Sequence, residues 1–347
     1  MKKIRALGLI SGGLDSTLAA CLMQRQGIEV IGVNFHTGFC ISDTRRQIRR
    51  KKDSNKFLRN EALRAASDLG FPLELVDVSE EYIQIVTNPR WGYGKNANPC
   101  VDCRIMMLRK TKDMMPNFDA DFVFTGEVLG QRPMTQYRIT LRQIEKHSGL
   151  EGFLLRPLSA KKLLETEIER RGWVNRELLK DFSGRSRKPQ MRLAEEFGIR
   201  DFPQPAGGCC YLTDPAFSRK FFDFLRHLPP QKTICLEDFI LLKVGRHLRL
   251  HDSLKIILGR DEAENDFLEN YTQGRWTLRA EDVVGPLGLA DGDLSDADLV
   301  RCAQVLARYS DGRGMPLVRV LCEKNGFSRE FTVRPMSPEE TEKYILS

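Results

Sequence analysis

The sequence predicts an α/β protein with a doubly wound, mainly parallel sheet and a second, smaller α+β domain at its C-terminal end. Three observations predict it. Short apolar strands alternate with helical patterns over residues 1–158, which is typical of parallel sheets. The first strand turns through Gly12 and Gly13 directly into a helix. Beyond residue 233 that alternation gives way to strands and helices of mixed order, which indicates a separate module.

The expected elements follow in order along the chain. Apolar runs predict the strands of the first sheet at residues 4–10, 30–35, 73–78, 121–126 and 154–158. Helical periodicity predicts helices at 17–23, 54–69, 165–173 and 217–228. In the last third we expect strands at 239–249, 254–260, 318–321 and 329–334, with helices at 261–271 and 299–309. The predicted domains are residues 1–158, an extension of helices and loops over 159–230, and residues 233–347.

The composition is that of an ordinary globular chain. Of its 347 residues, 41% are hydrophobic and 29% are charged. No apolar run approaches the ~20 residues of a membrane span, so we expect no membrane partner. The first strand begins within a few residues of Met1 and leaves no room for a signal peptide, so a cytoplasmic location is expected. The nine cysteines are then unlikely to form structural disulfides.

The formal charge of +7 favours a polyanionic partner. Two basic segments stand out, residues 44–52 and residues 183–190. Each is either a solvated surface loop or a contact with nucleic-acid phosphates. The candidate RNA-binding residues are Arg45, Arg46, Arg49, Arg50, Lys51, Arg185, Arg187 and Lys188.

The turn after the first strand has the features of an anion site. A strand that turns through two glycines into a helix gathers backbone N–H groups and a helix N-terminus around one point. Gly12 and Gly13 allow close backbone approach. Ser11 and Ser16 add hydroxyl donors, and Asp15 could hold a Mg²⁺ ion bound to phosphate oxygens. The alternative is an ordinary glycine turn.

Ser11-Gly12-Gly13-Leu14-Asp15-Ser16 resembles the pyrophosphate loop of the ATP pyrophosphatase (PP-loop) family, whose fold is like that of adenine nucleotide α-hydrolases. The resemblance implies that the loop binds the β- and γ-phosphates of ATP. It also implies that a substrate attacks the α-phosphate, giving an adenylated intermediate and pyrophosphate. The adenine is expected near Phe35 and the Gly126-Glu127 turn, because both follow strands at the ligand-binding edge of such a sheet.

Four cysteines are candidates for chemistry. Cys100 and Cys103 form a C-x-x-C pair before a helical pattern, and Cys209 and Cys210 follow about a hundred residues later. One cysteine of the later pair could complete a set of three thiolates. Three thiolates suit a [4Fe–4S] cluster with one open iron, or equally a persulfide carrier with a resolving thiol. Zinc-binding or buried cysteines are the remaining alternative. Cys40 has no assigned role.

The loop and the cysteines together resemble tRNA thiolation enzymes. Asn98-Pro99 followed by Cys103, and Gly208-Cys209-Cys210-Tyr211, are similar to the segments of tRNA 2-thiouridylases that supply two catalytic cysteines. The resemblance implies that Cys103 and Cys210 are catalytic. This chain has Cys100 where those enzymes have Asp, so no acid–base role is carried over. The C-x-x-C pair also resembles iron–sulfur-dependent tRNA thiolases, and that likeness favours Cys209 as the third ligand.

The whole-chain layout resembles proteins related to 4-thiouridine synthase. The C-terminal third resembles the RNA-binding domain of NFACT proteins, through residues 243–247 and 257–265. These resemblances imply an RNA-binding module, with a generic interaction domain as the alternative.

The leading hypothesis is an ATP-dependent tRNA sulfurtransferase that uses Mg²⁺, with 4-thiouridine at position 8 favoured and 2-thiouridine at position 34 as the alternative. The sulfur donor would be sulfide or a cysteine desulfurase. Two other hypotheses are a PP-loop ligase or amidotransferase that needs no RNA, and a zinc-stabilised RNA-binding protein without turnover. The oligomeric state is open, with a homodimer as one candidate.

Overall fold

The computed structural model describes residues 3–41, 60–203 and 210–346. They divide into two compact units. The first unit comprises the described residues 3–37 and 60–203, and the second comprises 38–41 and 210–346. This division places residues 210–230 in the second unit, whereas the sequence analysis assigns them to an extension that begins at residue 159.

In the first unit the described residues form a five-stranded sheet in the order β3-β2-β1-β4-β5, and every pair of neighbouring strands is parallel. The prediction of a doubly wound parallel sheet is confirmed. The strand order reverses between β1 and β4, and such a reversal opens a crevice at the carboxyl ends of the two strands. The strands are β1 (Arg5–Leu9), β2 (Glu29–His36), β3 (Leu73–Asp77), β4 (Phe122–Thr125) and β5 (Leu154–Leu155).

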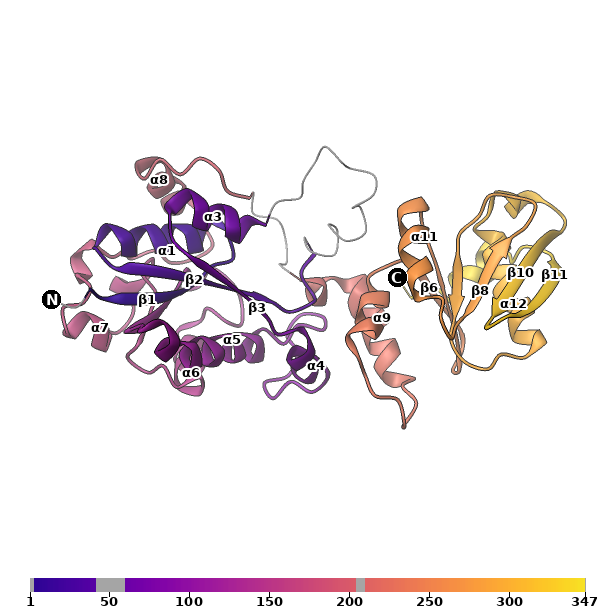
Figure 1. The fold of residues 1–347 in the computed structure, drawn as a ribbon, viewed down its shortest axis with the longest axis horizontal. Coiled ribbons are helices and arrows are strands. Elements are labelled where there is room, and N and C mark those ends of the chain that lie inside the picture. The colour runs from indigo at the N-terminus through magenta and orange to yellow at the C-terminus, as the bar shows by residue number, and fades with distance from the viewer. Residues whose placement is uncertain (1–2, 42–59, 204–209, 347) are drawn as a thin grey trace. The chain divides into compact units, whose positions relative to one another are not determined.

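Helices cover both faces of this sheet (Figure 1). One face packs against α1 (Leu14–Arg25), α3 (Glu61–Leu69) and α8 (Lys188–Glu196). The other packs against α5 (Cys100–Met114) and α6 (Arg138–Ser148), with α4 (Ser79–Thr87) beside α5. Apolar side chains at helical spacing, such as Leu14, Leu18 and Leu22 of α1, are buried in the first of these cores.

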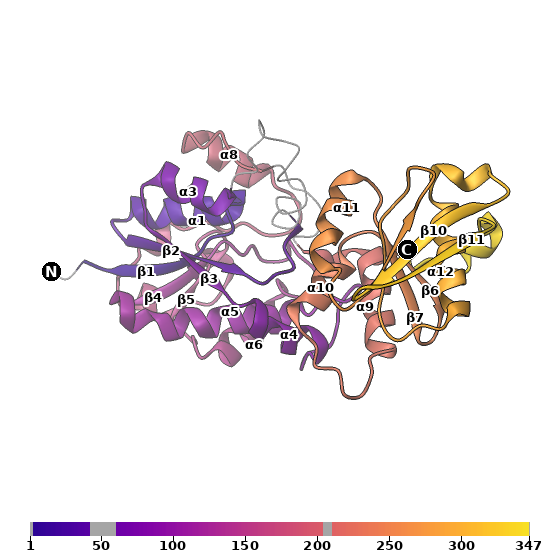
Figure 2. The ribbon, with the colours of Figure 1, turned by 45° about the vertical axis from the view of Figure 1, so that its right-hand side comes forward.

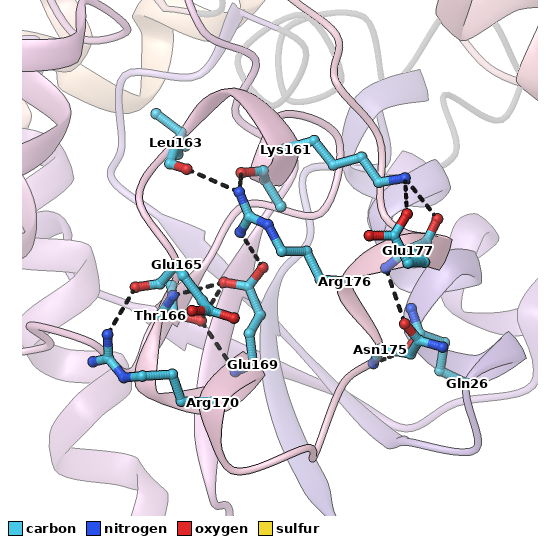
Figure 3. A network of polar contacts seen from close by, with 11 residues as sticks. Gln26, Lys161, Leu163, Glu165, Thr166, Glu169, Arg170, Asn175, Arg176 and Glu177 are labelled. Carbon is cyan, nitrogen blue, oxygen red and sulfur yellow. Dashed lines mark hydrogen bonds and ion pairs between the residues drawn. The ribbon is translucent and has the colours of Figure 1, made fainter.

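A polar network orders the segment that follows β5 (Figure 3). The helix predicted over 165–173 is shorter, α7 (Glu167–Arg170). Thr166 and Glu169 cap its start reciprocally, and Gly172 just beyond its end has a left-handed φ of +67°. The carboxylate of Glu169 also accepts from Arg176, whose guanidinium donates to the carbonyl oxygens of Ala160 and Leu163 at 2.9 and 3.0 Å. Side-chain hydrogen bonds, rather than a long helix or strand, therefore order residues 160–176.

The second unit contains, over its described residues, a six-stranded antiparallel sheet in the order β11-β10-β8-β9-β7-β6 (Figure 2). The hairpin of β10 and β11, at one edge of this order, turns at Asn325 and Gly326, both with positive φ, which is the backbone of a tight two-residue turn. The strands are β6 (Arg246–His251), β7 (Leu254–Leu258), β8 (Trp276–Ala280), β9 (Gly288–Ala290), β10 (Val318–Lys324) and β11 (Phe327–Val333).

One long helix, α12 (Asp296–Arg308), buries Leu299, Cys302 and Leu306 against this sheet. Ser295 and Asp298 form a capping box that fixes its first turn. The smaller α+β domain is confirmed as a fold. The other α-helices that the structure describes in the second unit are α9 (Pro215–Arg226), α10 (Leu236–Leu242), α11 (Glu262–Leu268) and α13 (Pro338–Glu342).

One predicted strand is wrong in its first half. Residues 236–242 form α10, and β6 begins only at Arg246. The side chain of Asp238 bonds back to the N–H of Cys235 and starts a helix whose Phe239 and Leu242 are buried. A short apolar run reads equally as a strand or a buried helix, which explains the error. The sequence analysis also missed β8 and β9. In the part of the chain that the structure describes, no helix is long and apolar enough to cross a membrane.

Candidate active site

The turn between β1 and α1 lies at the strand-order reversal. Gly12 has φ +75°, and a Cβ there would lie 2.1 Å from the carbonyl carbon of Glu61. Gly126, directly after β4, approaches the same turn from the other side, because a Cβ on it would lie 2.5 Å from the carbonyl carbon of Asp15. Glycine is therefore required at both positions. The carboxyl ends of strands β1 and β4 therefore lie on either side of this loop.

The loop leaves its backbone donors available for an anion. Gly13 is the N-cap of α1, and within the described residues no side chain caps this end. The hydroxyl of Ser16 donates to the Gly13 carbonyl at 3.0 Å and lies 3.3 Å from the hydroxyl of Ser11. An uncapped helix N-terminus beside two hydroxyls is a favourable place for phosphate oxygens. Phosphate binding by residues 11–16 stays a prediction that this uncapped turn allows.

Asp15 has one satisfied and one unsatisfied carboxylate oxygen. Its Oδ2 accepts from the Gln131 amide at 2.7 Å, and the Gln131 carbonyl accepts from Gln190 at 2.7 Å. Its Oδ1 is buried and, among the described residues, has no hydrogen-bond partner. A buried carboxylate oxygen is costly unless something pairs with it. The residues present therefore fit a Mg²⁺ ion at Oδ1, held beside phosphates on the loop.

Glu127, expected near the adenine, is a buried ion-pair residue. Its carboxylate is 3.1 Å from the Arg156 guanidinium and 3.2 Å from that of Arg104. Burial alone would raise the pKa of Glu127, but the charges of Arg104 and Arg156 outweigh it and lower that pKa. Glu127 thus stays ionised and ties the end of β4 to helix α5.

The C-x-x-C pair occupies the first turn of α5. Helix α5 starts at Cys100, and Cys103 lies one turn further on, with its N–H donating to the Pro99 carbonyl at 2.9 Å. The thiol of Cys100 donates to the side-chain oxygen of Asn98 at 2.7 Å. Asp102 accepts from the backbone N–H groups of Arg90 and Trp91, which anchors the loop that leads to the pair. A helix N-terminus stabilises thiolate charge, so this turn suits reactive cysteines.

The later cysteines are placed only in part. Cys209 lies outside the described residues, while Cys210 lies in the second unit and forms an isolated antiparallel bridge with Cys40. Among the residues that the structure describes, no group of three or more His, Cys, Asp or Glu side chains is positioned to hold a metal ion. Because Cys209 lies outside the described residues, a cluster ligand set that includes it stays a prediction.

The structure describes only one of the two basic segments. Residues 44–52, with Arg45, Arg46, Arg49, Arg50 and Lys51, lie outside the described residues. Arg185 and Lys188 are exposed, as a backbone contact with RNA would need. Arg187 is half-buried, and its guanidinium lies 3.9 Å from Asp15 Oδ2. This position suits a phosphate of the bound nucleotide as well as one of RNA.

Other residues of the site have no motif in the sequence. Gln131 and Gln190 orient Asp15, and Arg64 donates to the Gly12 carbonyl at 3.2 Å. Each reaches the loop from a distant part of the chain, so spacing gave no signal. Phe35 is half-buried and packs with the core on the α5 side of the sheet.

Two sequence families match separate parts of the chain. Residues 4–168 match the family described as tRNA methyl transferase HUP domain, and residues 245–345 match the NFACT protein RNA binding domain. The first match spans β1 to α7, including the loop and the C-x-x-C pair. The second spans the antiparallel sheet of the second unit.

Curated relatives match part of this chain. The tRNA-specific 2-thiouridylase MnmA of Cytophaga hutchinsonii is 35% identical over 146 residues, which cover 36% of this chain and 35% of that protein. MnmA of Nitrosomonas europaea is 29% identical over 255 residues, covering 72% of this chain and 64% of that protein. The chain thus spans about a third to two thirds of the length of these relatives.

Among solved structures, a 4-thiouridine synthetase in complex with RNA and bound ATP is 20% identical with a TM-score of 0.32, over 56% of this chain and 51% of that one. Residues 4–168 are thus similar to the tRNA methyl transferase HUP domain family, and residues 245–345 are similar to the NFACT protein RNA binding domain family.

Proposed function

We propose that this chain is an ATP-dependent tRNA sulfurtransferase that makes thiouridine. One observation carries the proposal. Gly126 packs against the backbone of Asp15, and the next residue, Glu127, pairs with Arg104, which follows Cys103 in the chain. The nucleotide loop and the cysteine turn are therefore fixed to one sheet edge. The matched RNA-binding domain and the relatives named tRNA-specific 2-thiouridylase support RNA as the substrate.

In the proposed reaction, the loop of Ser11–Ser16 binds the pyrophosphate part of ATP through backbone N–H groups and hydroxyls. A Mg²⁺ ion on Asp15 would neutralise phosphate charge there. Gln131 and Gln190 hold the carboxylate in place for it. A uridine carbonyl oxygen attacks the α-phosphate and releases pyrophosphate, which makes that oxygen part of a good leaving group, AMP. The uridine has to leave its base stack to react, at a cost of a few kcal/mol.

The sulfur step follows as nucleophilic catalysis. The terminal sulfur of a cysteine persulfide attacks the activated uridine carbon and displaces AMP. Cys103 and Cys210 are the proposed catalytic cysteines. A cysteine desulfurase, which hands over sulfur already at the persulfide oxidation level, is the proposed source on this route, and sulfide is the proposed source on the alternative cluster route. The persulfide route is the one we propose, and a [4Fe–4S] cluster held by Cys100, Cys103 and either Cys209 or Cys210 is the alternative.

The proposed product is 4-thiouridine at position 8, with 2-thiouridine at position 34 as the alternative that the names of the curated relatives support. Liquid chromatography with mass spectrometry of nucleosides, from tRNA treated with enzyme, ATP, Mg²⁺, cysteine and a cysteine desulfurase, separates the two isomeric products. Thiouridine at either site supports a sulfurtransferase, and the position of the modified nucleoside decides between them.

Asp15→Asn is the direct test of the nucleotide site. We expect it to abolish AMP and pyrophosphate release with tRNA, because a neutral amide cannot balance Mg²⁺ charge. Asp293→Asn changes an exposed carboxylate of the second unit and is the matched control. Normal AMP release by Asp15→Asn would show that the loop assignment is wrong. AMP release without RNA would favour a small-molecule ligase, and bound zinc without ATP turnover would favour an RNA-binding protein.

A further inference from the structure

Two cysteines far apart in sequence face each other in the second unit. Cys40 and Cys210 form an antiparallel bridge. The N–H of Tyr211 donates to the Phe39 carbonyl at 3.0 Å, so the hydrogen bond joins the residues that flank the two cysteines. In an antiparallel ladder that pattern makes Cys40 and Cys210 a non-hydrogen-bonded pair, in which Cα atoms lie about 4.5 Å apart and the side chains project from the same face.

This geometry fits a disulfide. Bridged cysteines have Cα atoms roughly 4.4 to 6.8 Å apart, and a non-hydrogen-bonded pair falls inside that range without movement of the backbone. Both cysteines are only half-buried, so reagents and substrates can reach them. Cys21, Cys302 and Cys322 are buried instead, and burial raises the pKa of each of these thiols.

The two short segments are held rigidly. Phe39 is fully buried, with its ring centroid 5.3 Å from that of Phe239 and 6.1 Å from that of Phe217. The ring of Tyr211 lies 5.7 Å from Phe217. Each cysteine is thus the direct neighbour of an aromatic ring in one cluster.

A buried cation joins both segments. The ammonium group of Lys243 donates to the Gly38 carbonyl and lies 5.3 Å from the Phe39 ring and 6.0 Å from the Tyr211 ring. Cation–π contacts of this kind contribute about 0.5–2 kcal/mol each. Lys243 therefore fixes the register that places Cys40 opposite Cys210.

We propose that Cys40 is the resolving thiol of Cys210. This inference rests on the proposed function. A persulfide on Cys210 attacks the activated uridine carbon, and AMP leaves with the bonding electrons, giving a Cys210–S–S–uridine mixed disulfide. The Cys40 thiolate, its proton lost to water, then attacks the Cys210 sulfur. A Cys40–Cys210 disulfide forms, and the sulfur bound to uridine leaves with the electron pair as thiouridine. The two cysteines supply the two electrons, and an external dithiol reduces the disulfide for the next turnover.

The first experiment needs no RNA. The full-length protein is oxidised with diamide, alkylated and digested with trypsin. Cys40 lies in the peptide of residues 26–45, and Cys210 lies with Cys209 in residues 201–219, so Cys209→Ser is used as the background. We expect a cross-linked pair of these peptides that disappears in Cys40→Ser. Cys235→Ser, which changes an exposed thiol of the second unit, should leave the cross-link unchanged. A cross-link from Cys210 to Cys103 in place of Cys40 would overturn the inference.

The second experiment follows one turnover. Protein loaded with persulfide is mixed with ATP, Mg²⁺ and tRNA and quenched with acid. Cys40→Ser should form AMP at the normal rate but release thiouridine at least tenfold more slowly. A protein–RNA adduct should accumulate, and dithiothreitol should cleave it. Normal thiouridine release by Cys40→Ser would refute the resolving role. If the wild type forms the cross-link but makes neither AMP nor thiouridine, the proposed function is wrong. The pairing of Cys40 with Cys210 is supported all the same.

Discussion

The amide of Gln131 and the carboxylate of Asp15, separated by 116 positions in sequence, share a 2.7 Å hydrogen bond at the nucleotide loop. Gln190 holds the other end of the Gln131 side chain. The bond occupies Oδ2 of Asp15, and the buried Oδ1 has no hydrogen-bond partner among the described residues, so it can accept a cation. A carboxylate held in one orientation loses less entropy when it binds a metal ion.

Gln131→Ala should therefore weaken nucleotide binding and leave the fold intact. We expect the KM for ATP, measured by pyrophosphate release, to rise about tenfold, which corresponds to about 1.4 kcal/mol. Gln143→Ala changes an exposed glutamine on α6 and should have no effect. An unchanged KM in Gln131→Ala would mean that the hydrogen bond does not orient Asp15 for the metal.

Gly126→Ala should damage the site more severely. A Cβ at this position would lie 2.5 Å from the Asp15 carbonyl carbon and from the Ser16 nitrogen, both backbone atoms that cannot rotate away. We expect loss of ATP binding by isothermal titration and a loss of stability of about 1–3 kcal/mol. Gly314→Ala is the control, because within 4 Å of its Cβ position there is no described atom. Full ATP affinity in Gly126→Ala would contradict the close approach of the two turns.

The Glu127 ion pair predicts how stability depends on pH. Its pKa in the folded protein lies below its ordinary value of 4.5. The folded state then binds fewer protons than the unfolded state in the window between the two values, so stability falls as pH falls. The contribution is complete above about pH 4.5 and is lost as pH drops through the folded pKa.

Glu127→Gln should lower the free energy of unfolding at pH 7 by about 3–5 kcal/mol, because Arg104 and Arg156 would keep buried, uncompensated charge. The difference from the wild type should shrink toward pH 3. Urea unfolding followed by circular dichroism measures both effects. Glu165→Gln, at an exposed position, should match the wild type. A difference that does not change with pH would remove the electrostatic explanation.

Variants of Arg187 and Arg185 should affect nucleotide binding and RNA binding separately. Arg187 lies 3.9 Å from Asp15, whereas Arg185 is exposed. Arg187→Ala should raise the KM for ATP several-fold. Arg185→Ala should raise the KM for tRNA and reduce the salt dependence of RNA binding by about one phosphate contact. The reverse assignment of the two effects would show that Arg187 contacts RNA.

Metal analysis of the purified protein distinguishes the persulfide route from the cluster route. After anaerobic purification and chelation, followed by return of Mg²⁺, we expect thiolation to survive and iron to be far below one atom per chain. Cys210→Ser should then lose thiolation and keep AMP formation, because it removes the thiol that carries the persulfide. About four irons and four sulfides per chain, lost in Cys100→Ala or Cys103→Ala, would establish a cluster and refute the persulfide route.

Much of the architecture could be predicted from the sequence because it depends on local patterns. The apolar runs at 4–10 and 30–35 are buried parallel strands, and the turn through Gly12 and Gly13 is dictated by the backbone. Prediction failed where local signals are ambiguous. Phe239–Leu242 is apolar in a way that suits a strand or a buried helix, and a single capping carboxylate at Asp238 decided for the helix.

The sequence by itself determined the nucleotide loop, the C-x-x-C turn and the change of fold class along the chain, because each is encoded by neighbouring residues. Only the tertiary structure decided that Gln131 orients Asp15, that Glu127 is held between Arg104 and Arg156, and that Cys40 lies opposite Cys210. These contacts join residues 23 to 170 positions apart. Their partners are selected by strand order and register, which depend on the packing of the whole unit and leave no periodic signal in the chain.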